Sequence, residues 1–295
     1  VRAQTHTDYE VIVVDDGGTD DTPARCAAAF PEVQVVRRAR NGGFARATNA
    51  GIAAASGPWL LLLNNDVTLA PDFLTRMLTA GEQADLVAPL ICWAAAPDTI
   101  YSAGDALLRN GRPVPIGWRV PRASFVPPAQ VFGVSACAGL FHRRVFETVG
   151  TLDETFGAYF EDADLCARAR LAGMRAALCT GAVAWHVGSA SIERRTWWRA
   201  RQCYRNHALL VVKNLPAAAL WRHAGAIARE RMHQAARCFS AARTELGAVR
   251  AAGVLLGAWW SGLCALPAAW RARRRIQRAR VLDAAAFVAL LSERA

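Results

Sequence analysis

The sequence predicts an α/β protein with a mostly parallel, doubly wound sheet, followed by a helical, basic C-terminal extension. Three short apolar runs, at residues 11–14, 33–36 and 59–63, alternate with stretches that favour helix. Strands that alternate with helices along a chain indicate a parallel sheet. Charge also divides the chain, since residues 1–193 hold 16 basic and 20 acidic side chains, whereas residues 194–295 hold 19 and 4. We therefore expect an α/β domain over 1–193 and an arginine-rich helical extension over 194–295.

The composition excludes several classes of protein. The chain has 295 residues, of which 53% are hydrophobic and 20% charged, so it can form a sizeable packed core. A disordered or collagen-like protein is excluded on these grounds. The eight cysteines are scattered, with no CxxC pair and no zinc-ligand spacing. Cysteines in this arrangement are typical of reduced core residues, and we expect a cytoplasmic protein.

The first predicted strand leads into an acidic turn. Residues 11–14 are apolar and largely β-branched, which favours a buried strand, and they are followed by Asp15 and Asp16. Pro23 suits the first turn of a helix that we expect to end near Phe30. This order predicts a strand, a turn and a helix.

The next two predicted strands follow the same plan. Residues 33–36 read as a strand and residues 41–43 as a turn. The alanine-rich stretch 44–55 then reads as a helix. The strand at 59–63 ends in the polar sequence at 64–66. In open α/β sheets ligands bind beyond the carboxyl ends of the strands, so these polar residues are candidates for a site.

The second half of the 1–193 stretch is less regular. Residues 93–132 are rich in Gly, Pro, Trp and Arg, and we expect loops and short strands that cover the site. A helix is predicted from about Glu161 to Ala172, and an apolar strand at 182–185 ends at His186. Helices at 196–213 and 217–245 are expected to carry the arginines.

Acidic residues at two strand ends suggest a site for a divalent cation and a diphosphate, because hard cations prefer carboxylate oxygens and neutralise phosphate charge. An Asp after a strand also often caps the next helix, and that alternative applies to Asp15 more than to Asp66. Glu161, Asp162 and Asp164 form a second acidic group at a helix start. There they could simply complement the helix dipole, or one could be a general base.

His186 has two interpretations as well. A single histidine at the end of an apolar strand is more often a structural residue. An acidic metal site nearby makes a ligand role possible. The sequence alone leaves both open.

Taken together, these segments resemble the family 2 glycosyltransferases of GT-A fold, especially the branch of rhamnosyl- and galactofuranosyltransferases. The matching stretches follow in family order: VIVVDDGGTDDT (11–22), NGGFARATNAG (41–51), WLLLLNNDV (59–67), FETVGTLDETFGAYFEDADLCARARLAGMRA (146–176) and AVAWHVGSAS (182–191). The long acidic stretch is the most specific of these.

The resemblance implies a reaction. It is inverting transfer of a sugar, such as rhamnose or galactofuranose, by a metal-dependent hexosyltransferase that uses Mn²⁺ or Mg²⁺. The donor would be a dTDP- or UDP-sugar, and the acceptor a lipid-linked or polysaccharide glycan of the cell envelope. In that reading the catalytic residues are Asp162, as the base, and Glu161 in support. The metal ligands are Asp66 and His186. The residues that bind the nucleotide-sugar are Asp15, Asp16, Asn41, Gly43, Asn49, Asn64 and Gly139.

The chain departs from the family pattern at its start. Family members have a strand and a helix ahead of the acidic turn, and the sequence from Val1 enters near the end of that helix. We therefore expect a sheet without its first β-α unit. An inactive remnant that only binds membranes or partners is the alternative to an enzyme.

The basic extension suggests membrane contact. Residues 251–270 are uncharged, contain three tryptophans and are flanked by Arg250 and by arginines at 271, 273, 274 and 275. An interfacial amphipathic hairpin on the cytoplasmic face of the plasma membrane fits this pattern. A true membrane span and a solvated basic face are the alternatives. The acidic first two thirds argue against nucleic acid as a partner, and the oligomeric state is left open.

Overall fold

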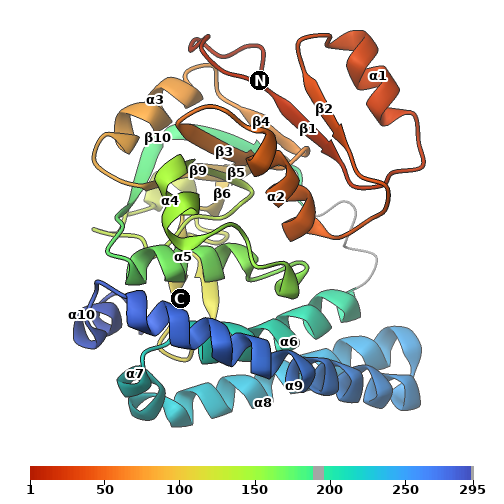
Figure 1. Cartoon of the computed structure of the whole chain (residues 1–295), viewed down its shortest axis with the longest axis vertical. Coiled ribbons are helices and arrows are strands. Elements are labelled where there is room, and N and C mark those ends of the chain that lie inside the picture. Colours follow the sequence, from red (N-terminus) through yellow and green to blue (C-terminus); the bar gives the residue numbers. More distant parts are fainter. Residues whose placement is uncertain (189–195, 294–295) are drawn as a thin grey trace.

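The computed structural model describes residues 1–188 and 196–293, which form an α/β body above a layer of long helices (Figure 1). The α/β class and the helical C-terminal region are therefore confirmed. The predicted domain boundary, between residues 193 and 194, lies outside the described residues, and the domain division stays a prediction.

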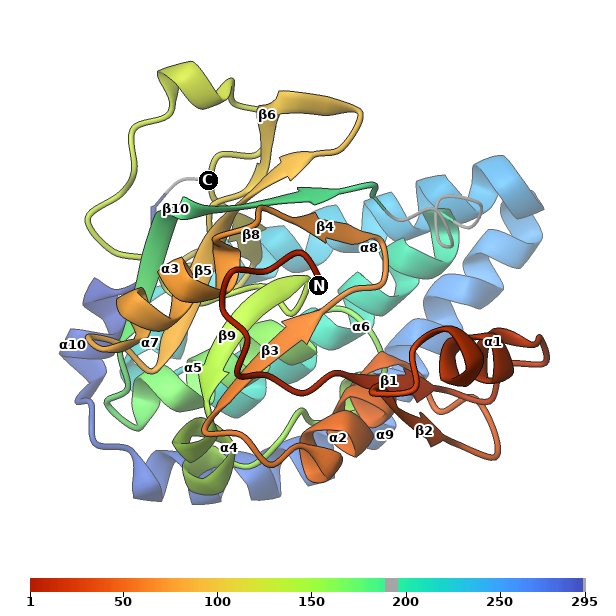
Figure 2. The same cartoon turned by 90° about the horizontal axis from the view of Figure 1, so that it is seen from above.

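The N-terminal strands form a small parallel sheet of their own. It is built by β1 (Ile12–Asp15), α1 (Thr22–Ala29), β2 (Gln34–Arg37) and α2 (Phe44–Ala54), with β1 hydrogen-bonded to β2. Helix α2 packs on both strands. Within the described residues β1 has no ladder to β3, and Figure 2 shows the two strands in separate sheets.

The main sheet has six strands and mixed pairing. Its order is β3-β9-β5-β10-β4, with β6 on β5. The strands are β3 (Trp59–Leu63), β4 (Val67–Leu69), β5 (Leu86–Trp93), β6 (Ala96–Ser102), β9 (Ala138–His142) and β10 (Ala176–His186). Only β5 and β10 are parallel, and the other pairs are antiparallel. The expectation of a mostly parallel sheet therefore holds for β1–β2 and β5–β10 alone, because β9 inserts antiparallel between β3 and β5.

The region predicted as loops and short strands is made of small elements. They are β7 (Asp105–Leu107), β8 (Pro113–Pro115) and the 3-10 turn η1 (Arg122–Ser124). Strands β7 and β8 form a two-stranded antiparallel ladder. An isolated bridge pairs Asp105 with Gly133, which places β7 next to the loop before β9.

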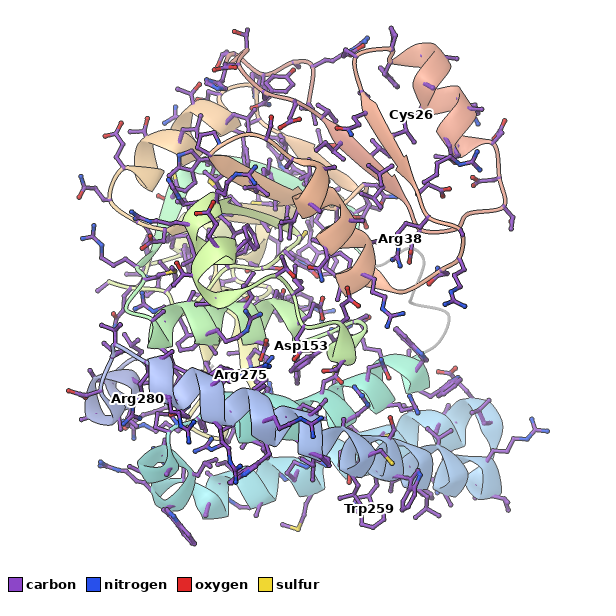
Figure 3. The ribbon with its side chains drawn as sticks, in the orientation of Figure 1. Cys26, Arg38, Asp153, Trp259, Arg275 and Arg280 are labelled. Carbon is purple, nitrogen blue, oxygen red and sulfur yellow. The ribbon has the colours of Figure 1, made fainter. Side chains whose placement is uncertain are left out.

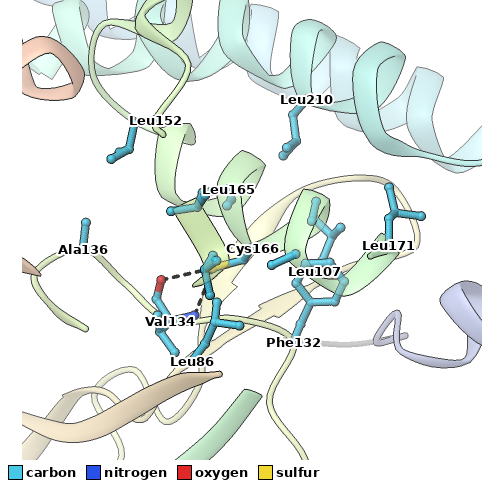
Figure 4. Close-up of a cluster of buried hydrophobic side chains, with 14 of the residues drawn as sticks. Leu86, Leu107, Phe132, Val134, Ala136, Leu152, Leu165, Cys166, Leu171 and Leu210 are labelled. Carbon is cyan, nitrogen blue, oxygen red and sulfur yellow. Dashed lines mark hydrogen bonds between the residues drawn. The ribbon is translucent and has the colours of Figure 1, made fainter. Parts of the chain in front are cut away.

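Helices cover both faces of the main sheet. Alternate side chains of β5 point to opposite sides: Leu86 and Ala88 join the core under α4 (Arg143–Val149) and α5 (Glu161–Leu171). Val87 and Ile91 join the core under α3 (Phe73–Gly81). Figure 4 shows part of the larger core, where Leu86, Leu165 and Cys166 meet. Complete burial of a Leu or Ile side chain stabilises a fold by about 1.5–3 kcal/mol.

The C-terminal region is a bundle of helices packed on α5. Its elements are α6 (Thr196–Asn214), α7 (Ala217–Arg222), α8 (Ala224–Leu246), α9 (Ala248–Ala279) and α10 (Ala284–Ala289). Helices α6, α8 and α9 contact one another, and α5 contacts both α6 and α9. The uncharged stretch 251–270 lies inside α9, which continues through Pro267.

Candidate functional site

Two residues of the predicted metal site meet at the edge of the main sheet. Asp66 follows β3, and His186 ends β10. Because β10 runs antiparallel to β4 with His186 opposite Val67, the imidazole lies beside the preceding Asp66. The His186 Nε2 to Asp66 Oδ1 distance is 3.1 Å.

This pair fits two ligands of one cation. Two atoms bound at about 2.1 Å and at right angles to each other are about 3.0 Å apart. His186 is buried, and its Nδ1 has no hydrogen-bond partner in the described part of the chain. No group of three or more potential ligands occurs among residues 1–188 and 196–293. The remaining ligands would therefore come from a diphosphate and water.

An aromatic cluster surrounds His186. Tyr101 meets the imidazole edge to face, with ring centroids 4.5 Å apart. Trp93 and Trp118 each lie within about 5 Å of Tyr101, centroid to centroid. This cluster was not predicted from the sequence, although the tryptophans of the 93–132 region are a signal for it.

The acidic block begins on a strained backbone. Tyr159 and Phe160 have φ of 68° and 73°, a region that residues other than Gly rarely adopt. Strain of this kind is frequent at functional sites. It turns the chain so that α5 begins at Glu161, which is buried and whose Oε2 has no partner in the described residues.

Asp162 is held by two backbone N–H groups. Its Oδ2 accepts from Ala136 N at 3.2 Å, and its Oδ1 accepts from Ala163 N at 2.8 Å. The first bond ties the candidate base to the 133–137 loop. The same loop reaches the end of β3, because Asn64 N donates to Cys137 O at 2.9 Å. The structure thus links Asn64, after β3, to Asp162 through one loop.

Burial makes these carboxyls hard to ionise. It raises the pKa of Asp162, against the effect of the two N–H donors. Burial and the charge of Asp162 hold the pKa of Glu161 well above its usual range. The same two causes raise the pKa of Asp105. Asp105 was not predicted as a site residue, since no motif marks it in the sequence.

The third acid of the block is structural. Asp164 accepts from Arg168 Nε at 2.9 Å, from Lys213 Nζ at 2.8 Å and from Asn214 Nδ2 at 2.7 Å. Burial would raise its pKa, but the two cations and Asn214 lower it. Asp164 therefore stays ionised and joins α5 to α6.

The carboxylates of Asp15 and Asp16, in the turn after β1, accept hydrogen bonds from backbone N–H groups. Asp16 accepts from Gly42 N and Gly43 N at 2.9–3.1 Å and from Arg38 Nη1 at 2.8 Å. Asp15 Oδ1 accepts from Gly18 N at 3.0 Å. Asp15 Oδ2 lies 3.7 Å from Arg37 Nε. Both carboxylates therefore fix the turns that would form the nucleotide side of the site.

The remaining predicted nucleotide residues connect this turn to the acidic block. Asn41 Oδ1 accepts from Gly43 N at 3.1 Å. Gly43 has a φ of 87°. Two residues later, the backbone N–H of Ala45 donates to Gly157 O at 3.1 Å. Asn49 bonds both backbone groups of Leu152, at 2.9 and 3.0 Å. The amide of Asn49 is occupied by this packing contact, and its predicted role in nucleotide binding stays a prediction.

Gly139 lies within β9, opposite Leu62 of β3. A Cβ at this position would lie 2.7 Å from Ser135 O. The glycine therefore lets the 133–137 loop fold back closely on β9. Contact with a sugar at Gly139 stays a prediction.

The chain is similar to known glycosyltransferases. Residues 1–150 match Glycosyl transferase family 2, which is half of the chain. The succinoglycan biosynthesis protein ExoO of Rhizobium meliloti is 45% identical over 83 residues, 28% of this chain and 24% of that protein. The N-acetylglucosaminyl-diphospho-decaprenol L-rhamnosyltransferase of Mycobacterium tuberculosis is 28% identical over 197 residues, 57% of this chain and 63% of that protein. The chain thus spans less than two thirds of either relative.

Solved structures share the fold at low sequence identity. The mannosyltransferase PcManGT from Pyrobaculum calidifontis, in complex with GDP-Man and Mn²⁺, aligns with a TM-score of 0.54 and 18% identity. That alignment covers 94% of this chain and 79% of the other. Residues 1–349 of TarS from S. aureus align with a TM-score of 0.54 and 14% identity, over 94% and 76% of the two chains. The fold is of the GT-A type, and the chain belongs to glycosyl transferase family 2.

Proposed function

We propose that this glycosyltransferase moves a sugar, with inversion, from a nucleotide-sugar to a lipid-linked or polysaccharide acceptor in cell-envelope glycan synthesis. One observation carries the proposal: in a family 2 chain, the 133–137 loop joins the end of β3 to the half-buried carboxylate of Asp162. The residues that would hold the donor diphosphate and the residue that would deprotonate the acceptor are thus connected by one loop.

The proposed chemistry assigns the proton to Asp162. Its carboxylate accepts the proton of the acceptor hydroxyl, whose oxygen then attacks the anomeric carbon of the donor as the bond to the diphosphate breaks. General-base help of this kind contributes about 10²–10⁴-fold to a rate. Glu161, the preceding residue, is buried and its pKa is raised. A neutral Glu161 carboxyl would add no negative charge next to ionised Asp162.

Asp66 and His186 would hold a divalent cation, which supplies charge to stabilise the leaving nucleoside diphosphate. A carboxylate oxygen suits Mg²⁺ and Mn²⁺, whereas an imidazole nitrogen favours a transition-metal ion. This donor set therefore favours Mn²⁺ over Mg²⁺. The mannosyltransferase with GDP-Man and Mn²⁺ supports the same choice.

The donor and acceptor are proposed from the relatives. The mycobacterial relative is an L-rhamnosyltransferase that acts on a decaprenol-linked substrate by name. For the present chain we propose a donor in which the sugar, rhamnose or galactofuranose, is linked to dTDP or UDP. Asp15, Asp16, Asn41 and Gly43 form the turns on which the nucleotide would rest.

A lipid-linked acceptor agrees with an exposed apolar stripe on α9. The stripe consists of Leu256, Trp259, Trp260, Leu263 and Trp270. Each lies three, four or seven residues from another member, which places all five along one face of the helix. Trp260 is 65% exposed, and Figure 3 shows Trp259 on the side of α9 away from the α/β body. Among the described helices α9 alone is long and apolar enough to cross a membrane. Because α9 also packs on α6 and α8, we propose that it does not cross the bilayer. Instead it lies against the cytoplasmic face of the plasma membrane.

Nucleotide binding tests the proposal. A ligand that binds only the folded state raises the melting temperature, and the shift grows with the logarithm of the ligand concentration divided by its Kd. We expect a shift with UDP, dTDP or GDP that requires Mn²⁺, and we expect Asp66→Ala to abolish it. Asp98→Ala, which removes an exposed carboxylate on β6, serves as the control and should keep the shift. Metal-dependent binding retained by Asp66→Ala would remove Asp66 from the site.

A further inference from the structure

An exposed tryptophan belongs to the aromatic cluster beside His186. Trp118 lies between β8 and η1 and is 39% exposed. The other exposed aromatic residues among 1–188 are Tyr9 and Phe30, which lie next to the small sheet of β1 and β2. Tryptophan is highly buried on average in folded proteins. The exposure of Trp118 next to the proposed metal pair therefore calls for an explanation.

Two half-buried rings hold the Trp118 side chain in place. Trp93 and Tyr101 each meet it edge to face, with ring centroids 5.1 Å apart in both pairs. Aromatic pairs in this geometry fix the direction of a ring as well as its position. A ligand that binds a side chain already held in this way loses little affinity to the ordering of that side chain.

The backbone that carries Trp118 is a strained turn. Val120 N donates to Gly117 O at 2.9 Å, and Ile100 of β6 bonds the turn twice, through Arg119 N and Val120 O. Arg119, the third residue of the turn, has a φ of 61°. A turn with a positive φ at its third residue usually has Gly or Asn there. Backbone strain of this kind clusters at functional sites, and here it belongs to the turn that exposes Trp118.

The ring lies on one side of the proposed transfer site. Tyr101 contacts both Trp118 and His186, so a single ring separates the exposed indole from the metal pair. Burial raises the pKa of Tyr101, and the charges of Asp105 and Asp66 add to that effect. Figure 2 shows β6, to which the turn is bonded, and the β1–β2 sheet with β3 and β4 between them. Because Asp66 joins β3 to β4, Trp118 lies on the side of the metal pair away from the turns proposed for the nucleotide.

We propose that the exposed indole of Trp118 stacks against a sugar ring of the acceptor. The inference rests on the transferase function proposed above and adds the side from which the acceptor binds. Inverting displacement requires the incoming oxygen and the leaving group on opposite faces of the donor sugar. With the nucleotide on the β1–β2 side, the β6 side is left for the acceptor. A flat apolar ring matches the C–H face of a sugar, and aromatic side chains commonly line small-molecule sites.

Saturation-transfer NMR tests this inference. The chain is mixed with millimolar methyl glycosides of rhamnose, galactose, mannose and N-acetylglucosamine, without Mn²⁺ because that ion is paramagnetic. Irradiation of the aromatic protons should transfer saturation to the C–H protons of at least one glycoside. Trp118→Ala should reduce this transfer at least about fivefold, whereas Trp118→Phe, which keeps a flat ring, should retain about half. The control Trp221→Ala, which removes an 84% exposed ring on α7, should leave it unchanged.

The opposite results are equally clear. Transfer to none of the four glycosides, or equal transfer in the wild type and Trp118→Ala, would overturn the inference. If Trp118→Ala melts at a lower temperature before any ligand is added, Trp118→Leu, which keeps an apolar side chain without a ring, replaces it. Loss of the Mn²⁺-dependent nucleotide shift in a Trp118 variant that melts normally would assign the ring to the donor and overturn the inference. A wild-type chain without any nucleotide shift would overturn the proposed function, while the glycoside signals would still decide whether Trp118 binds a sugar.

Discussion

At the scale of single residues, Asp162 determines the expected response of the enzyme to pH. A base must be ionised to accept a proton, and burial raises the pKa of Asp162. We therefore expect kcat/KM to fall as the pH drops through a value above the ordinary Asp pKa of about 3.9. Asp162→Asn should lower transfer about 10²–10⁴-fold, with nucleotide binding retained.

The matched control is Asp98→Asn, on an exposed part of β6, which should keep both activity and pH profile. Transfer is followed at a metal concentration that saturates the enzyme at every pH, so that loss of bound metal does not imitate protonation of the base. Normal transfer by Asp162→Asn would show that another group takes the proton. Asp105 would then be the first to examine, since it lies in the field of Asp162.

Lys213 makes a residue-scale contribution to stability. Its ammonium contacts Asp153 and Asp164 and lies 5.4 Å from the Phe156 ring centroid. Removal of one partner from a buried ion pair costs about 3–5 kcal/mol, because the opposite charge stays buried without compensation. Lys213→Met should lower the free energy of unfolding by that order, measured by urea denaturation. Arg271→Met, at an exposed position of α9, should change it by less than about 0.5 kcal/mol.

At the scale of elements, the 133–137 loop depends on close packing against α5. A Cβ added to Gly133 would lie 2.6 Å from Cys166 Cβ and 2.8 Å from its Sγ. Overpacking in a core costs about 1–3 kcal/mol, so Gly133→Ala should lower the melting temperature. It should also reduce transfer, because the same loop donates the Ala136 N–H to Asp162.

Gly225→Ala is the control, since nothing lies within 4 Å of its Cβ position in α8. That change should be neutral or stabilising by up to about 1 kcal/mol, because alanine favours helix. Calorimetry and a transfer assay on both variants make the comparison. A loss of stability by Gly133→Ala without loss of transfer would separate the loop from the reaction.

The order of most helices and strands could be predicted from the sequence, and the exceptions have physical reasons. Polar strand ends and the acidic block are local signals, and they predict Asp66, Asp162 and His186 as site residues; the structure brings Asp66 and His186 together. Chain order does not give spatial order, so the insertion of β9 between β3 and β5 was not predicted. Tyr101 lies on β6 and Asp105 on β7, two strands in a stretch of the sequence that carries no motif. Asp16 shows a further limit, because backbone N–H groups occupy the carboxylate that the family pattern assigns to the nucleotide.

At the scale of the whole molecule, His207 couples folding to pH. It is completely buried in α6, and its Nε2 bonds Asn110 O at 2.9 Å. Burial lowers the pKa of His207 to about 4, with Arg231 and Arg112 acting in the same direction and Glu230 and the Asn110 bond opposing them. The folded state therefore resists a proton that the unfolded chain binds below about pH 6.5.

Neutral His207 therefore makes its full contribution to the free energy of unfolding above pH 6.5. That contribution is lost as the pH falls towards 4, and the total loss is about 3 kcal/mol. We expect His207→Gln to show a flatter dependence of unfolding free energy on pH in that window. The carboxyls of Asp105, Glu161 and Asp162, whose pKa values are raised, stabilise the folded state as the pH falls. Their contribution is the same in both proteins, so it cancels when the two unfolding free energies are subtracted. Parallel curves for both proteins would contradict a neutral buried His207.

The small sheet of β1 and β2 has a consequence for the affinity with which the nucleotide-sugar binds. Two strands alone are marginally stable, and this pair is joined to the body mainly through α2 and the turn at Gly43. Its amides should therefore exchange with deuterium much faster than those of β5, because it can open while the main sheet stays closed. A nucleotide that rests on the turns of Asp15 and Asp16 would slow that exchange. Binding of the nucleotide-sugar would then include local folding of the β1–β2 sheet. The apparent affinity for the donor would depend on the fraction of molecules in which this sheet is already folded.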